Sequence, residues 1–235
     1  MGTLGFLTPF DINDFEATLC KVLSADKQPV PCTLRTRLRC ELIKRGSVTA
    51  MHHVLNEVVV DRGAFPSAIL LEVYIDDNYI TTVEADGLII ATPSGSTAYS
   101  MSVGGSLIAP SVPCTILSPI APHSLSFRPV VIPDSSTLCL RLAHNARHAA
   151  RVSFDGKNTM LLPKGTFLTV EATRFPLPTI NLSNMDLDWY EGIVQKLKWN
   201  TTLRPTPKPL GSAELMRLDM LDDAEDDALL VSSEG

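Results

Sequence analysis

The sequence lacks any apolar run long enough to span a membrane. Apolar stretches such as residues 68–71 and 88–91 hold four residues each, whereas a membrane-spanning helix needs about 20. The first ten residues also lack the basic segment followed by an apolar one that marks a secretory signal. The length of 235 residues and the 45% apolar content predict one folded body. We expect no membrane partner and, by default, a cytoplasmic location.

Paired cysteine motifs are absent as well. The five cysteines are odd in number and none stands in C-x-x-C spacing, which argues against a disulfide framework and against a zinc site. The five histidines have no cysteine or carboxylate partners at metal-ligand spacing. We therefore expect no bound metal among the protein's own side chains and a reducing, intracellular setting.

The body of the chain has little net charge of either sign. The formal net charge is −6, and residues 212–235 hold eight acids and one base, a net of −7, so residues 1–211 carry +1. A nearly neutral body gives no reason to expect a nucleic-acid partner. The composition predicts a folded domain over residues 1–204, then a proline-rich linker and an acidic, disordered tail over 205–235. The apolar residues within 215–221 leave a docking role for the tail open.

Short strand-like segments separated by turn residues dominate the body. The expected strands include residues 58–60, 68–75, 79–83, 88–91, 136–142, 151–154, 160–162 and 166–172. Asp76-Asp77-Asn78 and Asp155-Gly156 have the turn chemistry of hairpins. Helices are expected only near residues 14–23, after Ser96 and at 186–199. This pattern predicts a mainly β, antiparallel fold.

Residues 86–105, DGLIIATPSGSTAYSMSVGG, form the most informative segment. An apolar run leads through a Pro-Ser-Gly-Ser turn into small residues and a tyrosine, which is the order of strand, tight turn and helix start. Gly95 permits a positive φ or the close approach of another backbone or a ligand. Ser96 or Thr97 is suited to cap the following helix. Such a turn can bind polar or anionic groups, although an ordinary capped turn has the same composition.

This segment resembles the signature stretch of the NAD kinase family, in which a D-G pair, a strand and T-P-[ST]-G-S-T-A-Y form one wall of the dinucleotide site. Further segments match the same family in the same order: GTLGFLTPF at 2–10, LNEV at 55–58, SPI at 118–120 with HSLSFRP at 123–129, and VSFDG at 152–156. The resemblance covers residues 2–204, and the S-L-S-F-R-P wording favours the animal-type branch.

The resemblance implies a two-layer, sandwich-like β domain and a kinase that phosphorylates NAD at the 2′-hydroxyl of its adenosine ribose to give NADP. ATP, with a divalent cation such as Mg²⁺, would be the phosphoryl donor, and the assembly would be a homo-oligomer. Asn56 and Glu57 would contact the adenosine part, because an amide pairs with an adenine edge and a carboxylate with ribose hydroxyls. The other implied binding residues are Phe6, Asp86, Ser94, Thr97, Ala98, Tyr99, Ser102 and Asp155, with Asp86 and Ser102 near the nicotinamide.

Each of these positions also has a purely structural interpretation. Asn56-Glu57 suits a turn before a strand, Asp86-Gly87 a hairpin turn, Ser102 an exposed helix position, Phe6 a core position and Asp155-Gly156 a type I′ turn.

One family motif has no match in the 235 residues. The resemblance includes G-G-D-G-T, whose glycines let the backbone approach phosphate and whose aspartate acts as general base, and no G-G-D-G occurs here. No Walker or G-x-G-x-x-G loop occurs either. Because the family's motif precedes the segment at 2–10, we expect the general base and an α/β domain to lie upstream. We assign no catalytic residue and expect this chain alone to bind better than it reacts.

Two other functions stay open. One is a non-catalytic NAD(P)-binding or oligomerising subunit that has lost the base. The other is a related lipid kinase of the diacylglycerol type, against which the intact STAY and Asn-Glu motifs argue.

The expected helix at 186–199 carries a structural prediction of its own. It places Trp189, Ile193 and Leu197 on one face. The resemblance implies that this face packs on the α/β domain, so we expect it to be exposed here. The alternative is that the helix folds back on the β body.

Overall fold

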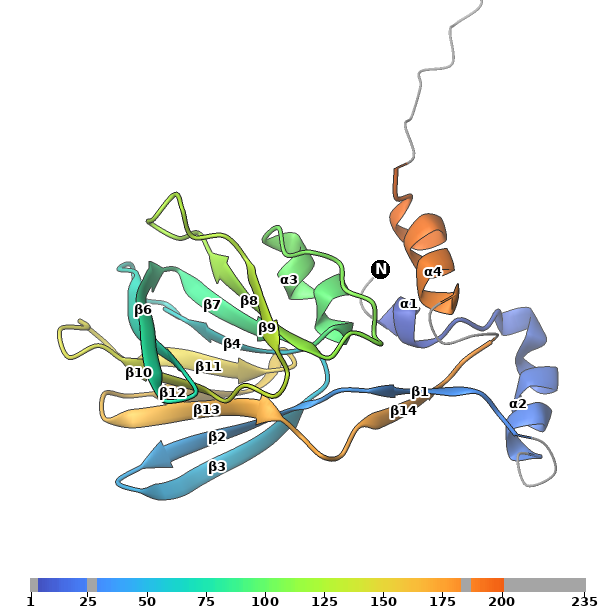
Figure 1. Ribbon diagram of the computed structural model, residues 1–235, viewed down its shortest axis with the longest axis horizontal. Coiled ribbons are helices and arrows are strands. Elements are labelled where there is room, and N and C mark those ends of the chain that lie inside the picture. The colour runs from blue at the N-terminus through green and yellow to red at the C-terminus, as the bar shows by residue number, and fades with distance from the viewer. Residues whose placement is uncertain (1–3, 25–28, 183–186, 201–235) are drawn as a thin grey trace, which may run out of the picture. The chain divides into compact units, whose positions relative to one another are not determined.

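Two six-stranded antiparallel sheets form two layers in this computed structural model, which describes residues 4–24, 29–182 and 187–200 (Figure 1). In spatial order the first sheet contains β3 (Ser47–Val54), β2 (Leu38–Lys44), β13 (Thr166–Ala172), β10 (Leu138–Leu142), β5 (Ile69–Ile75) and β6 (Asn78–Ala85). The second contains β12 (Lys157–Leu162), β11 (Ala150–Phe154), β4 (Glu57–Asp61), β7 (Gly87–Ala91), β8 (Cys114–Ile120) and β9 (Val130–Pro133). A separate two-stranded ribbon pairs β1 (Cys32–Arg35) with β14 (Leu177–Ile180). The expectation of a mainly β, sandwich-like fold is confirmed.

The main core lies between the two six-stranded sheets. Strands of the first sheet alternate, so that Leu138, Leu140 and Leu142 of β10 are buried while the residues between them are partly exposed. Val58 and Val60 of β4 and Leu88 and Ile90 of β7 belong to the same cluster. Burial of each such side chain contributes about 1.5–3 kcal/mol, so this interdigitation is the main stabilising interaction of the fold.

The second sheet is buried on both faces around β7. All five residues of β7 are buried, and its outward side chains Ile89 and Ala91 join Val59, Ile108 and Ile116 in a second cluster. Residues 92–108 therefore cover the outer face of this sheet. Double coverage explains why residues 88–91 form a continuous apolar run instead of alternating with polar residues.

Both expected hairpins are confirmed. Asp76 and Asp77 have φ values of 49° and 64° and join β5 to β6. Asp155 and Gly156 have φ values of 48° and 67° and join β11 to β12. Two successive positive φ values define the type I′ turn, which Asp and Gly favour. Asn78 begins β6 and is not part of the turn.

The chain crosses between the sheets at two of the candidate site positions. β3 belongs to the first sheet and β4 to the second, so Leu55 and Asn56 make one crossing. β6 and β7 likewise belong to different sheets, and Asp86 makes the other crossing. The interpretation of Asp86-Gly87 as a hairpin turn is therefore wrong.

The helices agree in part with expectation. α2 (Phe15–Leu23), preceded by the 3₁₀ turn η1 (Ile12–Asp14), and α4 (Leu187–Leu197) occupy the expected positions, and η2 (Ser94–Thr97) with α3 (Tyr99–Ser102) follows β7. α1 (Leu4–Leu7) was not expected. Neither η2 nor α3 has a side-chain cap, so the capping role expected of Ser96 or Thr97 is wrong.

The expectation that the apolar face of α4 is exposed is wrong. Trp189 and Ile193 are each only 7% exposed, and they line a pocket with Ser106 and Leu107. The helix contacts α1, where Gly192 lies against the ring of Phe6, so its cover includes a neighbouring helix, and packing on the β body, which was the alternative, stays a prediction. Tyr190, Val194 and Trp199 remain exposed.

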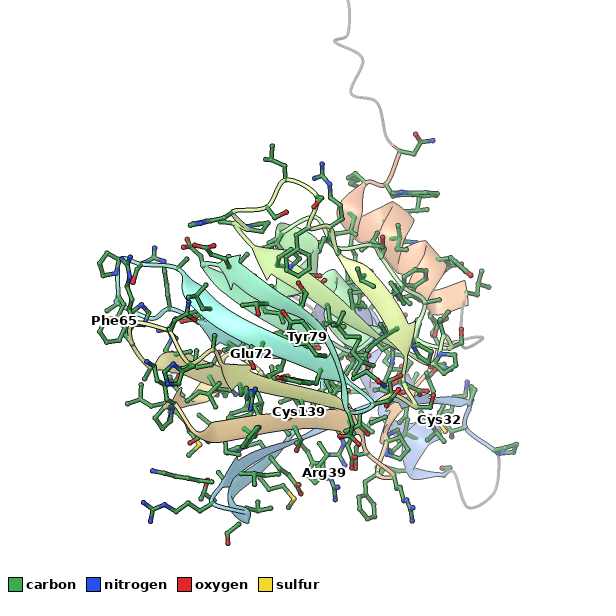
Figure 2. All side chains as sticks on the ribbon, turned by 60° about the vertical axis from the view of Figure 1, so that its left-hand side comes forward. Cys32, Arg39, Phe65, Glu72, Tyr79 and Cys139 are labelled. Carbon is green, nitrogen blue, oxygen red and sulfur yellow. The ribbon has the colours of Figure 1, made fainter. Side chains whose placement is uncertain are left out.

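The outer face of the first sheet carries polar and charged side chains, whereas its inner face is apolar. Arg141 of β10 donates to Glu72 of β5 at 2.6 Å and to the Tyr74 hydroxyl at 2.8 Å. Figure 2 shows Glu72 and Cys139 as side chains on neighbouring strands of this sheet. Cross-strand pairs of this kind stabilise an exposed sheet face.

The predicted boundary between residues 204 and 205 stays a prediction. Residues 1–199 and 200–235 form two separate units, and the expected linker and acidic tail lie outside the described residues.

Candidate functional site

Three strand ends meet at one edge of the second sheet. β4 begins at Glu57, which pairs with Ala91 at the end of β7, and Val58 pairs with Phe154 at the end of β11. The turns that leave these ends therefore lie together: residues 55–57, residues 92–97 and the Asp155-Gly156 turn. Three of the segments that the sequence singled out separately converge here.

Asp155 fixes the backbone of residues 55–57. Its Oδ2 accepts from the N–H of Leu55 at 2.8 Å, and its Oδ1 accepts from the N–H groups of Asn56 at 2.8 Å and Glu57 at 3.1 Å. The N–H of Asp155 in turn donates to the carbonyl of Glu57 at 2.9 Å. Hydrogen bonds to an ionised acceptor are about twice as strong as neutral ones. The crossing between the sheets is thus held by one carboxylate.

The turn after β7 is fastened to the same crossing. The N–H of Thr92 donates to the carbonyl of Asn56 at 2.8 Å, and its hydroxyl donates to the carbonyl of Leu55 at 2.6 Å. A Cβ at Gly95 would lie 2.1 Å from the Asn56 carbonyl oxygen. Gly95 therefore serves the close approach of another backbone, one of its two expected uses, and its φ is not positive.

Side-chain hydrogen bonds of Ser96 and Thr97 fasten η2. Thr97 donates to the carbonyl of Ser94 at 3.1 Å. The Ser96 hydroxyl exchanges bonds with the backbone of Ile108, accepting from its N–H at 3.0 Å and lying 3.3 Å from its carbonyl. Ser94 and Thr97 are buried, whereas Ala98 is half-buried and Tyr99 is 42% exposed. The rigid turn presents the aromatic ring of Tyr99 at its surface.

Two acceptors at the centre of this arrangement have no donor. Asn56 Oδ1 and Glu57 Oε2 are buried and have no hydrogen-bond partner in the described chain. Burial, with a smaller effect of the Asp155 charge, raises the pKa of Glu57 to about 7, against the lowering effect of the Tyr99 N–H. Buried polar groups in proteins nearly always have partners. These two oxygens are thus prepared for donors from outside the chain.

Of the remaining predicted residues, Asp86 lies apart. It stands at the opposite end of β7, where it accepts from Arg62 at 2.8 Å, and four residue steps along a strand separate the two ends by about 13 Å. Ser102 is exposed on α3, the helix that begins at Tyr99. Phe6 packs on Gly192 of α4, and Lys196 lies 5.6 Å from its ring centroid. The described chain brings together Asn56, Glu57, the 94–99 segment and Asp155, and it places Asp86 away from them.

Thr92 was missed by the sequence analysis. It holds both Leu55 and Asn56, and its hydroxyl also accepts from the N–H of Gly95 at 3.1 Å. It belongs to the quoted T-P-S-G-S-T-A-Y stretch, so the motif was the available signal. Its partners lie 37 positions away, which no local pattern reveals.

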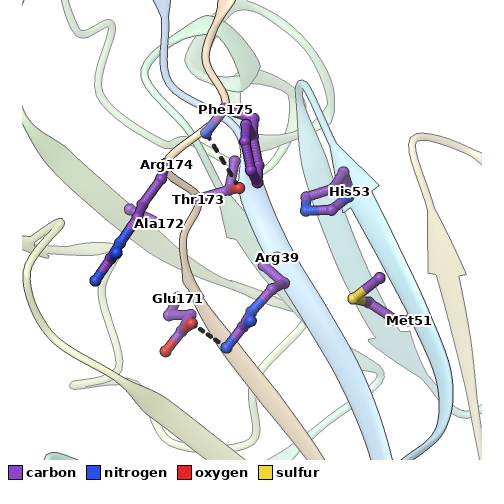
Figure 3. Close-up of a pocket in the computed structure, with 8 residues that line it drawn as sticks. All are labelled: Arg39, Met51, His53, Glu171, Ala172, Thr173, Arg174 and Phe175. Carbon is purple, nitrogen blue, oxygen red and sulfur yellow. Dashed lines mark hydrogen bonds and ion pairs between the residues drawn. The ribbon is translucent and has the colours of Figure 1, made fainter.

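A groove of about 440 Å³ lies on the outer side of the first sheet, away from these turns (Figure 3). Arg39 lies in it, with Glu171 accepting from its Nη2 at 2.5 Å and Glu41 3.7 Å from its Nε. Two carboxylates already compensate this arginine. None of the predicted site residues lines the groove.

Two further properties concern the described residues only. They contain no group of three His, Cys, Asp or Glu side chains that could hold a metal ion. None of the helices found in them is long and apolar enough to cross a membrane.

The chain thus has a two-layer β body whose strand-end turns hold two buried acceptors that have no partner in the described residues. The family model of the ATP-NAD kinase C-terminal domain matches residues 55–182, which span both turns and Asp155. The chain belongs to the NAD kinase family.

Individual relatives agree with this assignment. The chain is 45% identical over 207 residues to NAD kinase 2, chloroplastic, of Arabidopsis thaliana, covering 86% of this chain and 21% of the relative. It is 43% identical over 215 residues to the ATP-NADH kinase YEF1 of Saccharomyces cerevisiae, covering 85% and 42% respectively. The chain thus spans between about a fifth and two fifths of the length of these two relatives.

Solved structures match as well. A crystal structure of yeast NADH kinase complexed with NADH aligns with a TM-score of 0.78 and 35% identity, over 86% of this chain and 57% of that one. An NAD kinase from Archaeoglobus fulgidus in complex with ATP aligns with a TM-score of 0.62 and 24% identity, over 77% and 66%. The second likeness concerns the fold alone.

Proposed function

We propose that this chain forms the dinucleotide-binding part of an NAD kinase, an enzyme that phosphorylates the 2′-hydroxyl of the adenosine ribose of NAD with ATP to give NADP. The observation that carries the proposal is the pair of buried, unpartnered oxygens, Asn56 Oδ1 and Glu57 Oε2, held in place by Asp155 and Thr92. Support comes also from the family to which the chain belongs and from the yeast relative whose structure contains NADH.

The two oxygens suit the adenosine part of a dinucleotide. Asn56 Oδ1 accepts a hydrogen bond from an amino group such as that of adenine, and Glu57 Oε2 accepts from ribose hydroxyls. Tyr99, exposed beside them, offers a ring face for stacking. Ser94, Thr97 and Ala98 shape the wall, and their direct contacts with the ligand stay predictions.

The other predicted ligand contacts are proposals that the positions of the residues support less well. Asp86 and Ser102 would serve the nicotinamide end, and Asp86 lies a strand's length from Glu57. Phe6 lies against Gly192 of α4, and its contact with the ligand stays a prediction.

The reaction needs more than these residues. The 2′-oxygen attacks the γ-phosphorus of ATP, the bond from that phosphorus to the bridging oxygen breaks, ADP leaves, and a general base receives the hydroxyl proton. By the resemblance that base belongs to G-G-D-G-T, which the 235 residues do not contain, so we assign no catalytic residue here. A divalent cation would accompany ATP. The described side chains include no group of three His, Cys, Asp or Glu residues that could hold one.

Of the alternatives, neither the non-catalytic subunit nor the diacylglycerol-type lipid kinase is favoured, because the relatives compared are NAD and NADH kinases. Homo-oligomerisation stays a prediction. A cytoplasmic location also stays a prediction, since one relative is chloroplastic by name.

Calorimetric titration tests the proposal. The purified chain should bind NAD, NADH or NADP, and Asn56→Ala should weaken binding about 5- to 150-fold, because the amide's hydrogen bonds to the ligand are lost at about 1–3 kcal/mol. Asn145→Ala, a change at an exposed asparagine between β10 and β11, is the control and should bind as the wild type does. A folded wild type that binds none of the three dinucleotides, or unchanged binding by Asn56→Ala, contradicts the assignment.

A further inference from the structure

Asp155 is engaged by the protein's own backbone, although the resemblance implies a position beside a ligand. Its two oxygens accept three backbone hydrogen bonds, from Leu55, Asn56 and Glu57. These donors lie 98 to 100 positions earlier in the chain. The carboxylate thus joins the tip of the β11–β12 hairpin to the crossing from β3 to β4.

The turn conformation of Asp155 directs its side chain to this crossing. Asp155 has a φ of 48°, which is unfavourable for most residues and tolerated by Asp and Asn. Its own N–H donates to the Glu57 carbonyl, so the two backbones are joined in both directions. The three donors come from a crossing segment, and only one of these residues, Glu57, belongs to a strand. Without the carboxylate, partly buried N–H groups would lose their acceptor.

We propose that Asp155 is a positioning residue for dinucleotide binding: its carboxylate fixes the backbone of residues 55–57, so that the Asn56 and Glu57 side chains are presented to the ligand in one orientation. It acts through these two residues and does not itself touch the dinucleotide. This inference rests on the proposed function for its ligand, but the ordering of residues 55–57 is independent of any ligand.

The charge of Asp155 has a second consequence at Glu57. Burial is the larger cause that raises the pKa of Glu57 to about 7, the Asp155 charge adds to it, and the Tyr99 N–H from α3 opposes it. Cys40 of β2, in the first sheet, also lies near Asp155. Burial and, to a smaller extent, the Asp155 charge raise the pKa of the Cys40 thiol, so the thiol stays neutral. Arg151 of β11, which interacts with Tyr99, is paired with Asp61 at 2.9 Å. Removing the Asp155 charge should therefore lower the pKa of Glu57.

The test compares Asp155→Asn with a matched control. Asn tolerates the same positive φ and keeps one acceptor oxygen, but it loses the charge and turns an amide toward an N–H group. Asp76→Asn is the control, because Asp76 occupies the equivalent place in the β5–β6 type I′ turn and accepts from the Thr137 N–H at 2.8 Å, on the other sheet.

The binding readout is NADH affinity across pH. In the wild type, affinity should rise as pH passes through about 7, because the ionised Glu57 accepts more strongly from ribose hydroxyls. Asp155→Asn should bind about 10- to 100-fold more weakly at high pH, and its midpoint should move to lower pH. Asp76→Asn should match the wild type. A general loss of structure in Asp155→Asn would weaken NADH binding without moving the midpoint of affinity against pH. The proposal is overturned if Asp155→Asn keeps the wild-type midpoint or the wild-type affinity.

A ligand-free readout separates this proposal from the proposed function. Amide hydrogen exchange should show the N–H groups of Leu55, Asn56 and Glu57 protected in the wild type and exposed in Asp155→Asn, with Asp76→Asn unchanged. Protection without NADH binding would contradict the proposed function and leave the anchoring by Asp155 established. If Asp155→Asn does not fold, exchange in the wild type alone decides, and unprotected amides at these three residues overturn the proposal.

Discussion

At the scale of single residues, the site depends on acceptors that the protein does not satisfy itself. Glu57 is 7% exposed and Asn56 Oδ1 is buried, whereas Asp155 beside them accepts three backbone hydrogen bonds. Unpartnered buried polar groups lower stability and persist where a ligand supplies the missing partner. The residue types alone favour a turn for Asn56 and Glu57, and the binding role stays a prediction that the burial of their unpartnered oxygens supports.

Glu57 should make the stability of the free protein depend on pH. Its pKa of about 7 in the folded chain lies above the ordinary value of a carboxyl group, so folding favours the protonated form. The resulting stabilisation is full below about pH 4.3 and is lost as pH rises through about 7, at about 1.4 kcal/mol per pH unit.

Urea unfolding at about pH 5 and about pH 8 measures this effect. From the lower to the higher pH, the free energy of unfolding should fall more in the wild type than in Glu57→Gln, whose side chain cannot ionise. Equal falls in the two proteins would show that Glu57 is not the buried titrating group.

At the scale of elements, local turn chemistry was the most reliable guide. The type I′ turns at Asp76-Asp77 and Asp155-Gly156 followed from composition, and the apolar run at 88–91 predicted β7. β2 and β3 were not predicted, although the alternating burial of β2 is visible in its sequence LRCELIK. The reach of Asp155 to Leu55 was beyond prediction, because a contact across 100 positions follows from sheet order and not from local pattern.

The contact between the two turns gives a prediction at this scale. In Gly95→Ala the new Cβ would lie 2.1 Å from the Asn56 carbonyl oxygen, and 2.7 Å from its carbonyl carbon, so one backbone must move. We expect a loss of stability of about 2 kcal/mol or more, as for other overpacked sites, together with weaker dinucleotide binding.

Gly104→Ala is the comparison for that variant. Gly104 has a φ of 84° and nothing within 4 Å of an added Cβ, so the change should cost only the conformational penalty of about 1 kcal/mol. Thermal unfolding measures both variants. Equal losses would mean that the two turns are not packed as described.

At the scale of the whole molecule, the 235 residues carry the turns proposed to bind the dinucleotide and not the family's general-base motif. The chain spans 21% to 42% of the two curated relatives compared, and the motif that resemblance assigns to the general base is not among its residues. The exposed face expected of α4 was wrong, because the resemblance described the helix in the company of another domain. Trp189 and Ile193 are instead covered within the described chain.

The central claim is that the turns at residues 55–57 and 92–99 form the dinucleotide site. NADH titration followed by amide NMR tests this claim most directly, because it reports every position at once. The account predicts resonance changes concentrated at Asn56, Glu57 and residues 92–99, and their loss in Asn56→Ala. Changes concentrated instead at the groove around Arg39 and Phe175, or no changes in the folded wild type, would contradict it.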